Sequence, residues 1–341
     1  MKSLVLFNNK GGVGKTTLTY HLAHMFSQLG LCVVALDYDP QCNLTAALVE
    51  EDTLVKLWQA PETEGRTVAA CLDPVRRGRG QLRTPKLFQV QEEGDVNLWL
   101  LPGHLNLGLF EQTVAREWPQ TMAQDNERAL DVVLALSALA HRAAESVGAD
   151  IVLCDIGPSL GALNRAALLA CDHVIVPLAA DLFSLQGLRN VGPTLRTWRE
   201  DFETVCAKHL AQHPFSGFAG HRFGPLGYIL QQHIARADRP VSSYQTWASQ
   251  IPTRFRQDLL GVVPEGPVPG VQDDPHCIAL VRHFASLMPL AQVARKPMFD
   301  LKQADGVGGG GFYTVRDCRN MFEKLARSVC QRMNVPVRPA Q

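Results

Sequence analysis

The segment Lys10-Gly11-Gly12-Val13-Gly14-Lys15-Thr16-Thr17 follows a short apolar run, Leu4–Phe7, and precedes apolar residues at helical spacing that stop at Gly30. The run predicts a buried parallel strand, and the spacing predicts an amphipathic helix that ends at this glycine. Glycines between a strand and a helix let backbone N–H groups curl around a phosphate, where the helix N-terminus adds positive potential. The segment therefore predicts a phosphate-binding loop of the form Gly-x-x-x-x-Gly-Lys-Thr, with Asn9 in place of the first glycine.

Two side chains of this loop suit a nucleotide bound with magnesium. Lys15 would reach the β- and γ-phosphates, and the Thr16 hydroxyl would ligate Mg²⁺. The alternative is a glycine-rich turn that happens to contain a lysine. The Gly-Lys-Thr ending, between an expected strand and an expected helix, favours the phosphate loop.

Apolar runs alternate with helical stretches along the rest of the chain. Strands are expected at 32–36, 96–101, 151–154, 173–177 and 227–230, and helices at about 125–147, 161–170, 184–213 and 313–333. The segments 214–225 and 260–275, rich in Gly and Pro, are expected to be loops. This alternation predicts an α/β fold with a mostly parallel β-sheet and helices on both faces.

Composition narrows the classes of function. The 33 Lys and Arg balance the 33 Asp and Glu, and 46% of the residues are apolar. A disordered chain is thereby excluded, and any contact with nucleic acid must come from a local basic patch. The scattered cysteines indicate reduced thiols, and no apolar stretch reaches the length of a membrane span, so we expect a cytoplasmic protein.

Acidic residues follow two of the expected strands. Asp155 comes at the end of 151–154, and Asp37 and Asp39 follow 32–36. At the carboxyl edge of a parallel sheet, Asp155 would hold the water shell of Mg²⁺, and one carboxylate of the other two would orient an attacking water. The alternatives are a helix cap for Asp155 and a turn before Pro40 for the other pair.

The loop contains an additional lysine, Lys10, and in this it resembles the deviant Walker A motif of the ParA/MinD family of dimeric ATPases. Leu36–Gln41 resembles the second-strand motif of that family, and Val152–Gly161 resembles its Walker B segment. Asp181–Leu188 and Leu290–Phe299 also resemble ParA. The resemblance implies a P-loop NTPase of the deviant Walker A type, as a single domain over 1–341 with insertions at about 50–95 and 200–225.

The resemblance also implies roles for individual residues in a homodimer that binds ATP and Mg²⁺. Lys10 would cross to the phosphates of the partner subunit, although it could instead be a solvated lysine at the loop mouth. Asp39 would join Lys10 and Lys15 in catalysis, and Asp37 would support Mg²⁺ together with Thr16 and Asp155. The residues that would contact the nucleotide are Lys10, Gly11, Gly12, Val13, Gly14, Lys15, Thr16, Thr17, Gln231 and Pro252, the last two beside the base.

ParA proteins bind DNA without sequence preference through basic surface residues of the ATP-bound dimer. The candidates here are Arg254, Arg256, Arg282, Arg295, Lys296 and Lys302, with a second cluster at Arg76, Arg77, Arg79, Arg83 and Lys86. Charge runs are usually solvated faces, so this expectation rests on the resemblance. Because Arg295 and Lys296 lie outside the phosphate loop, replacing them is expected to leave nucleotide binding intact.

These features favour an ATPase that partitions or positions DNA or another cargo, stimulated by a small partner protein. One alternative is an ATP-dimer switch that recruits a protein of an envelope, secretion or defence system. Another is a membrane-associated, MinD-like ATPase, because the expected last helix has an apolar stripe with basic residues opposite. Such a stripe usually packs on its own domain, so membrane binding is not the favoured function.

Overall fold

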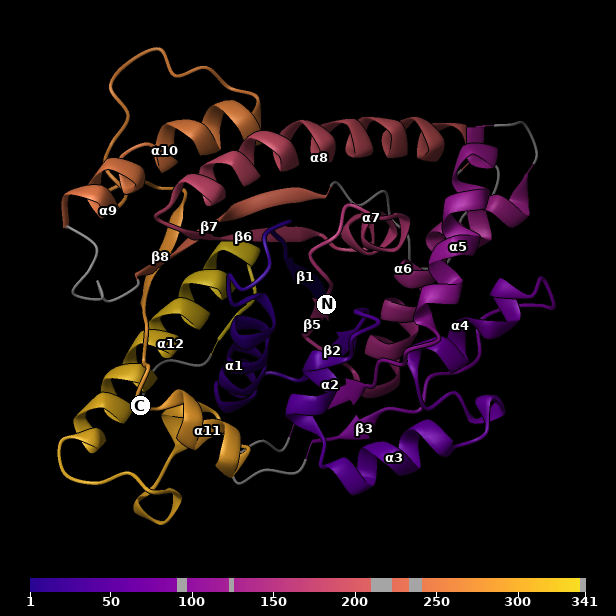
Figure 1. The fold of residues 1–341 in the computed structure, drawn as a ribbon. Helices are drawn as coiled ribbons and strands as arrows, with labels where there is room; N and C mark the ends of the chain where they lie inside the picture. Colours follow the sequence, from indigo (N-terminus) through magenta and orange to yellow (C-terminus); the bar gives the residue numbers. More distant parts are fainter. Residues whose placement is uncertain (91–96, 123–125, 210–222, 233–240, 338–341) are drawn as a thin grey trace.

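The computed structural model describes residues 1–90, 97–122, 126–209, 223–232 and 241–337. The described residues form an eight-stranded sheet in the order β3-β4-β2-β5-β1-β6-β7-β8 (Figure 1). Neighbouring strands are parallel except for β3 and β4, which are antiparallel. The strands are β1 (Lys2–Leu6), β2 (Val33–Asp37), β3 (Phe88–Gln89), β4 (Leu98–Leu101), β5 (Ile151–Asp155), β6 (His173–Ala179), β7 (Gly224–Gln232) and β8 (Cys277–Arg282).

Helices cover both faces of this sheet, which confirms the predicted α/β fold. The α-helices are α1 (Lys15–Gln28), α2 (Asn43–Leu48), α3 (Glu51–Gln59), α4 (Val68–Arg76), α5 (Leu107–Glu117), α6 (Glu127–Val147), α7 (Ala162–Leu169), α8 (Leu182–His209), α9 (Val241–Ala248), α10 (Ile251–Arg254), α11 (Met288–Ala294) and α12 (Gly311–Met333). The shorter helical turns are η1 (Glu62–Glu64), η2 (Trp118–Met122), the π-helical η3 (Phe255–Leu260), η4 (Met298–Asp300) and η5 (Gln303–Asp305).

The side chains of β1, and of Phe7 directly after it, show how the sheet is buried between two layers. Val5 and Phe7 belong to the core shared with α4 to α8, whereas Leu4 and Leu6 belong to the core shared with α1, α2 and α12. All four are fully buried. Because successive strand residues point to opposite faces, an unbroken apolar run is what a strand covered on both faces requires. Figure 1 shows α8 and α7 on one side of the sheet and α1, α11 and α12 on the other.

Some elements differ from the sequence-based expectation. The edge strands β3 and β8 were not predicted, because the first is two residues long and the second alternates only partly between buried and half-exposed residues. The polar segment 50–90, for which no element was predicted, contains α3, η1, α4 and β3. Most of the loop predicted at 214–225, residues 214–222, lies outside the described residues, as does the end of the helix predicted at 184–213.

The apolar stripe of the last helix is covered by the chain itself. Cys318, Phe322, Leu325 and Val329 of α12 are buried, and the helix packs against α1 and η4. This packing contradicts the interpretation of the stripe as a membrane-binding face. None of the described helices is both long enough and apolar enough to span a membrane.

A buried histidine links α1 to this C-terminal layer. The Nδ1 of His21 donates to the Thr17 carbonyl at 2.7 Å, and its Nε2 accepts from the Met298 amide at 3.2 Å. The ring stacks on Phe322 with centroids 4.8 Å apart. Burial lowers the pKa of His21 to about 4. Protonation would remove the acceptor that holds Met298, so the folded state keeps the imidazole neutral.

The free energy of unfolding should therefore depend on pH through His21. His21 takes up a proton near pH 6.5 in the unfolded chain and only near pH 4 in the folded chain. Its contribution to the free energy of unfolding is therefore fully present above pH 6.5 and is lost as the pH falls from 6.5 to 4. We expect a loss of roughly 2–3 kcal/mol from this group between pH 7 and pH 4.5, and a smaller loss in His21→Gln. Urea unfolding of both nucleotide-free proteins at the two pH values measures it. Equal losses in both would contradict the assignment.

Candidate functional site

The loop after β1 has the backbone that its glycines predict. Gly12 and Gly14 have φ values of 72° and 68°, in the left-handed region that favours glycine, and α1 begins at Lys15. Before them, the Asn8 side chain anchors the loop to β6 by donating from Nδ2 to the Pro177 carbonyl at 2.8 Å. The Asn8 Oδ1 accepts from the Lys10 amide at 3.0 Å. The loop is therefore shaped by the protein alone.

Lys15 lies at the centre of this loop and is almost fully buried. Its Nζ donates to the carbonyls of Asn8 at 2.9 Å and Lys10 at 3.1 Å. Burial lowers the pKa of Lys15, and the nearby carboxylates of Asp155 and Asp39 oppose this shift. An anionic phosphate at this position would likewise favour the charged ammonium.

The pairing of β2 with β5 brings acidic residues together at the carboxyl edge of the sheet. Asp37 lies opposite Asp155 in the register of the two strands. The Thr16 hydroxyl donates to Asp155 Oδ2 at 2.8 Å, whereas Asp155 Oδ1 is buried with no hydrogen-bond partner among the described residues. Burial, and then the charge of Asp37, raise the pKa of Asp155 well above its usual range.

These oxygen atoms fit the magnesium site that the sequence predicts at Thr16 and Asp155. Magnesium is usually held by one or two carboxylates together with substrate phosphates and water. In keeping with this, the described residues contain no group of three or more His, Cys, Asp or Glu side chains arranged to hold a metal. A cation beside the Oδ1 of Asp155 would also reduce the repulsion between Asp155 and Asp37.

Asp37 itself has a different environment from the one predicted. Its Oδ2 accepts from the amide of Thr45 at 2.8 Å and from the Thr45 hydroxyl at 2.6 Å, and its Oδ1 accepts from the Asp39 amide at 3.2 Å. Burial raises the pKa of Asp37 to about 6. Donors of the chain reach both oxygens, so Asp37 joins β2 to α2. Its support of Mg²⁺ stays a prediction.

Asp39 lies two residues further along the chain and faces a cavity. Its Oδ1 accepts from the Gln41 amide at 3.0 Å, and a Cβ added to Gly157 would lie 3.3 Å from the same oxygen. The glycine of the segment after β5 thus leaves room for the carboxylate. Asp39 remains free to contact a water or a phosphate in the cavity.

The cavity has a volume of about 620 Å³, within the usual range for ligand pockets. It is bounded by the phosphate loop, α1, α2, the segment after β5, and α11. The described residues that line it are Gly11, Gly12, Gly14, Lys15, Thr16, Thr17, Tyr20, His21, Asp39, Asn43, Ala46, Ala47, Ile156, Pro158, Met288, Ala291, Gln292, Arg295 and Lys296.

Arg295 and Lys296 line this cavity, although both lie outside the phosphate loop, so replacing them would change the surface that a nucleotide there would meet. Arg295 donates from Nη1 to the Val49 carbonyl at 2.9 Å, and the Lys296 Nζ lies 3.1 Å from Asp305 Oδ1. The sequence could not show that these residues line the cavity, because only the tertiary fold brings the end of α11 close to α1 and α2. Tyr20 and His21 were missed for the same reason.

Pro252 is buried in α10 and is not among the described residues that line the cavity, and its contact with the base stays a prediction. One other expectation is corrected. The Arg256 side chain is only 13% exposed and pairs at 2.7 Å with Asp274, whose side chain is fully buried. The Arg256 guanidinium therefore forms an ion pair inside the protein, and the prediction that Arg256 contacts DNA is wrong.

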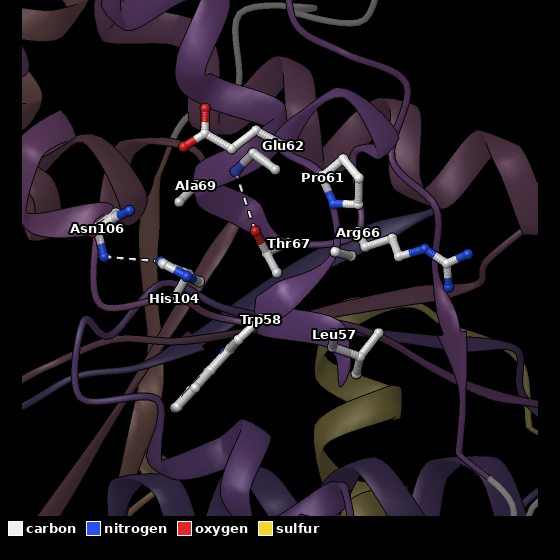
Figure 2. Close-up of a pocket in the computed structure, with 11 residues that line it drawn as sticks. Leu57, Trp58, Pro61, Glu62, Arg66, Thr67, Ala69, His104 and Asn106 are labelled. Carbon is white, nitrogen blue, oxygen red and sulfur yellow. Dashed lines mark hydrogen bonds between the residues drawn. The ribbon is translucent and has the colours of Figure 1, made fainter. Parts of the chain in front are cut away.

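A second, smaller cavity of about 130 Å³ lies between α3, the start of α4 and residues 104–106 (Figure 2). Trp58 borders it and donates from its indole nitrogen to the Gly103 carbonyl at 3.0 Å. Figure 2 shows Thr67 capping α4 and His104 accepting from the Asn106 amide, so these polar groups are already paired. The volume is too small for a nucleotide.

Lys10 points away from the larger cavity, unlike Lys15. Its Nζ forms an ion pair of 2.5 Å with Asp181 Oδ2 and lies 5.7 Å from the centre of the Phe183 ring. The Asp181 Oδ1 accepts from the Ser184 amide at 2.8 Å, at the start of α8. Hydrogen bonds from Lys10 and Ser184 outweigh burial and lower the pKa of Asp181. Asp181 was assigned no role from the sequence, although it follows β6 and so lies at the same carboxyl edge of the sheet as Asp155.

The AAA-domain family matches residues 1–206, which is more than half of the chain and includes the phosphate loop, Asp39 and Asp155. The chain belongs to the ParA/MinD family of P-loop ATPases. Residues outside this range, from α11, complete the cavity of this family member.

Curated relatives and solved structures agree with this assignment. The chain is 31% identical to Protein IncC of Escherichia coli, over 59% of this chain and 47% of IncC. It is 28% identical to the chromosome-partitioning ATPase Soj of Treponema pallidum, over 60% of this chain and 68% of Soj. It spans about half the length of several curated relatives. Its fold is similar to that of protein DIP2308 from Corynebacterium diphtheriae, with a TM-score of 0.69, 22% identity and coverage of 98% and 99%. A putative plasmid partition protein from Borrelia burgdorferi bound to AMPPNP has a TM-score of 0.56, 16% identity and coverage of 97% and 98%.

Replacing Lys15 should disable this ParA/MinD-family site. We expect Lys15→Ala to weaken ATP binding at least about tenfold, because it removes charge-assisted hydrogen bonds to the phosphates and leaves two loop carbonyls without their donor. Calorimetric titration with ATP and Mg²⁺ measures the affinity, and Lys56→Ala on the exposed surface of α3 is the control. Equal affinity in Lys15→Ala and the control would refute the assignment.

Proposed function

We propose that this protein is an ATP-dependent, dimerising switch that partitions or positions DNA or another cargo and hydrolyses ATP to ADP and phosphate with Mg²⁺. The observation that carries the proposal is the contrast between the two lysines of the phosphate loop. Lys15 lines the cavity, whereas Lys10 extends from the same loop to an exposed surface at Asp181 and Phe183. A lysine held at the mouth of the loop is suited to the phosphates of a second subunit.

The surface around Lys10 supports a dimer at this position. Phe183 is 70% exposed and Leu182 is 52% exposed, although both are large apolar residues beside a charged loop. Leu160, near the end of the Walker B segment, is also exposed. Burying these side chains against a second copy would favour association, and it would bring each Lys10 towards the opposite cavity.

Hydrolysis at such a site depends on positioning and on neutralising charge. Asp39 would orient the attacking water, and Thr16 and Asp155 would hold Mg²⁺. When bound, the magnesium ion offsets negative charge on the β- and γ-phosphate oxygens. Lys10 would add positive charge from the partner subunit, so that turnover requires the dimer.

The cargo hypothesis is supported by the names of the relatives, which include a chromosome-partitioning ATPase and plasmid partition proteins. In this proposal the ATP-bound dimer binds DNA without sequence preference, and a small partner protein stimulates hydrolysis. The protein would then be cytoplasmic and associated with the nucleoid. Arg282 and Lys302 are exposed candidates for phosphate contacts.

A protein-recruiting switch is the second candidate, and charge pairing favours it. Several predicted DNA-binding side chains already face carboxylates: Arg254 lies 4.0 Å from Asp258, and Lys296 lies 3.1 Å from Asp305. In the second cluster, Arg76 and Arg77 both bind Asp73. Such pairing lowers the positive potential that a DNA backbone would meet.

Releasing Lys10 from Asp181 should favour the dimer. Asp181→Asn removes the charge that holds the ammonium while keeping an acceptor for the Ser184 amide, so we expect half-maximal dimerisation at a roughly 3- to 10-fold lower protein concentration with ATP. Sedimentation velocity with ATP and with ADP measures it, and Asp317→Asn on the exposed face of α12 is the control. An unchanged or weaker dimer would show that the ion pair does not compete with dimerisation.

DNA retention decides between the two functions. We expect duplex DNA of unrelated sequence to bind the wild type with ATP but not with ADP, and Asp39→Ala, which keeps ATP unhydrolysed, to bind at least as well. Replacing Arg282 and Lys302 by Glu should weaken retention and reduce the salt slope by roughly 0.9 for each DNA phosphate that is no longer neutralised.

The same charge change at Arg79 and Lys86 is the matched comparison in gel-shift assays. If those substitutions weaken retention instead, the DNA face belongs to the second basic cluster. Equal retention with ATP and ADP, or none with either, would favour the protein-recruiting switch.

A further inference from the structure

The side chain of Gln231 reaches the phosphate loop from two strands away. Gln231 lies near the carboxyl end of β7, opposite Ala179 of β6 and Val281 of β8. Its Nε2 donates to the Val13 carbonyl at 2.7 Å. Since β6 lies between β7 and β1 in the sheet, this hydrogen bond reaches past the end of β6 (Figure 1).

The same amide fills the space beside Gly14. A Cβ placed on Gly14 would lie 2.5 Å from the Nε2 of Gln231, closer than real Cβ contacts come. Gly14 already has a left-handed backbone, so glycine is required here by its φ value and also by the packed amide. Gln231 and the loop therefore fit each other closely.

The direction of the Val13 carbonyl decides where the next amide points. In a trans peptide the C=O of one residue and the N–H of the next point in opposite directions, and no described peptide bond is cis. Holding the Val13 oxygen towards β7 therefore turns the Gly14 N–H away from β7. Gly14 lines the cavity, whereas neither Val13 nor Gln231 is among the described residues that do so.

We infer that Gln231 is a positioning residue that fixes the Val13–Gly14 peptide so that the Gly14 amide faces the phosphates. The inference rests on the proposed nucleotide function and goes beyond it by giving a residue of β7 a role in phosphate binding. The contact with adenine that the resemblance implies for Gln231 stays a separate prediction. A free carbonyl at Val13 would let the peptide flip and direct an oxygen, instead of an N–H, at the phosphates.

Substitutions that remove only the donor test this role. Gln231→Met keeps the length of the side chain, and Gln231→Glu keeps its shape but places a carboxylate against the Val13 oxygen. We expect Met to weaken ATP and ADP binding by a similar factor of roughly 3 to 10, and Glu to weaken both further. The ratio of ATP to GTP affinity should stay at its wild-type value, because the Gly14 amide that Gln231 positions would contact phosphate and not the base.

Kinetics supply a readout that a structural defect would not reproduce. Loss of an amide that binds phosphate weakens the binding of ATP and of the transition state equally. KM should therefore rise by the same factor as the dissociation constant of ATP, while kcat stays within about twofold of the wild-type value. The nucleotide-free variant Gln231→Met should unfold at the wild-type temperature within a few degrees. Gln331→Glu, on the exposed side of α12, is the charge control and should bind ATP as the wild type does.

The outcomes are distinguishable. Wild-type affinity for ATP and ADP in both Gln231 variants would overturn the inference, and so would a fall in the ATP to GTP affinity ratio, which would show that Gln231 acts through the base. A loss of thermal stability that accounts for the loss of binding would also overturn it. If the wild type itself binds no ATP, the proposed function fails instead.

Discussion

Every contact of the nucleotide site depends on β1 lying in the interior of a parallel sheet. The loop after β1 is tied to β5 by Thr16 and Asp155, to β6 by Asn8 and the Pro177 carbonyl, and to β7 by Gln231. Parallel strands end at one edge, so residues that are far apart in the sequence meet there without a long loop having to fold over them. The phosphate loop is thus held from both sides before any nucleotide binds.

This arrangement brings buried carboxylates close together, and nearby hydrogen-bond donors offset part of the free energy that their burial costs. Asp37 and Asp155 face each other across β2 and β5, and burial raises the pKa of both. Thr45 stabilises the first carboxylate through two hydrogen bonds, whereas Thr16 and Lys15 stabilise the second only in part. The incompletely compensated member is the one beside the phosphate loop, where a cation and phosphates would complete the pairing.

The sequence predicts the parts of the site whose geometry is local. The loop from Gly11 to Thr16 and the carboxylate of Asp155 follow from a strand, a turn and a helix in succession, and the structure has them in that arrangement. Contacts that depend on strand order or on the packing of another helix were not predicted. Gln231 reaches the loop because β7 lies next to β6, and Asp37 accepts from Thr45 because α2 folds back onto β2. Arg256 was misassigned because its charge is balanced by Asp274, which no spacing pattern reveals.

The cavity is not complete within the part of the chain that matches the family. Residues 1–206 supply the phosphate loop, α2 and the segment after β5, but Met288, Ala291 and Arg295 close the opposite side. Arg295 adopts a left-handed backbone at the end of α11 and binds the carbonyl of Val49, which ends α2. A nucleotide in this cavity would therefore touch α2, which is linked to Asp37 and Asp39, and at the same time α11, which precedes η4 and α12. Binding would couple the acidic edge of the sheet to the C-terminal layer through direct contacts with both. In the proposed switch, the C-terminal segment would therefore contact the nucleotide directly.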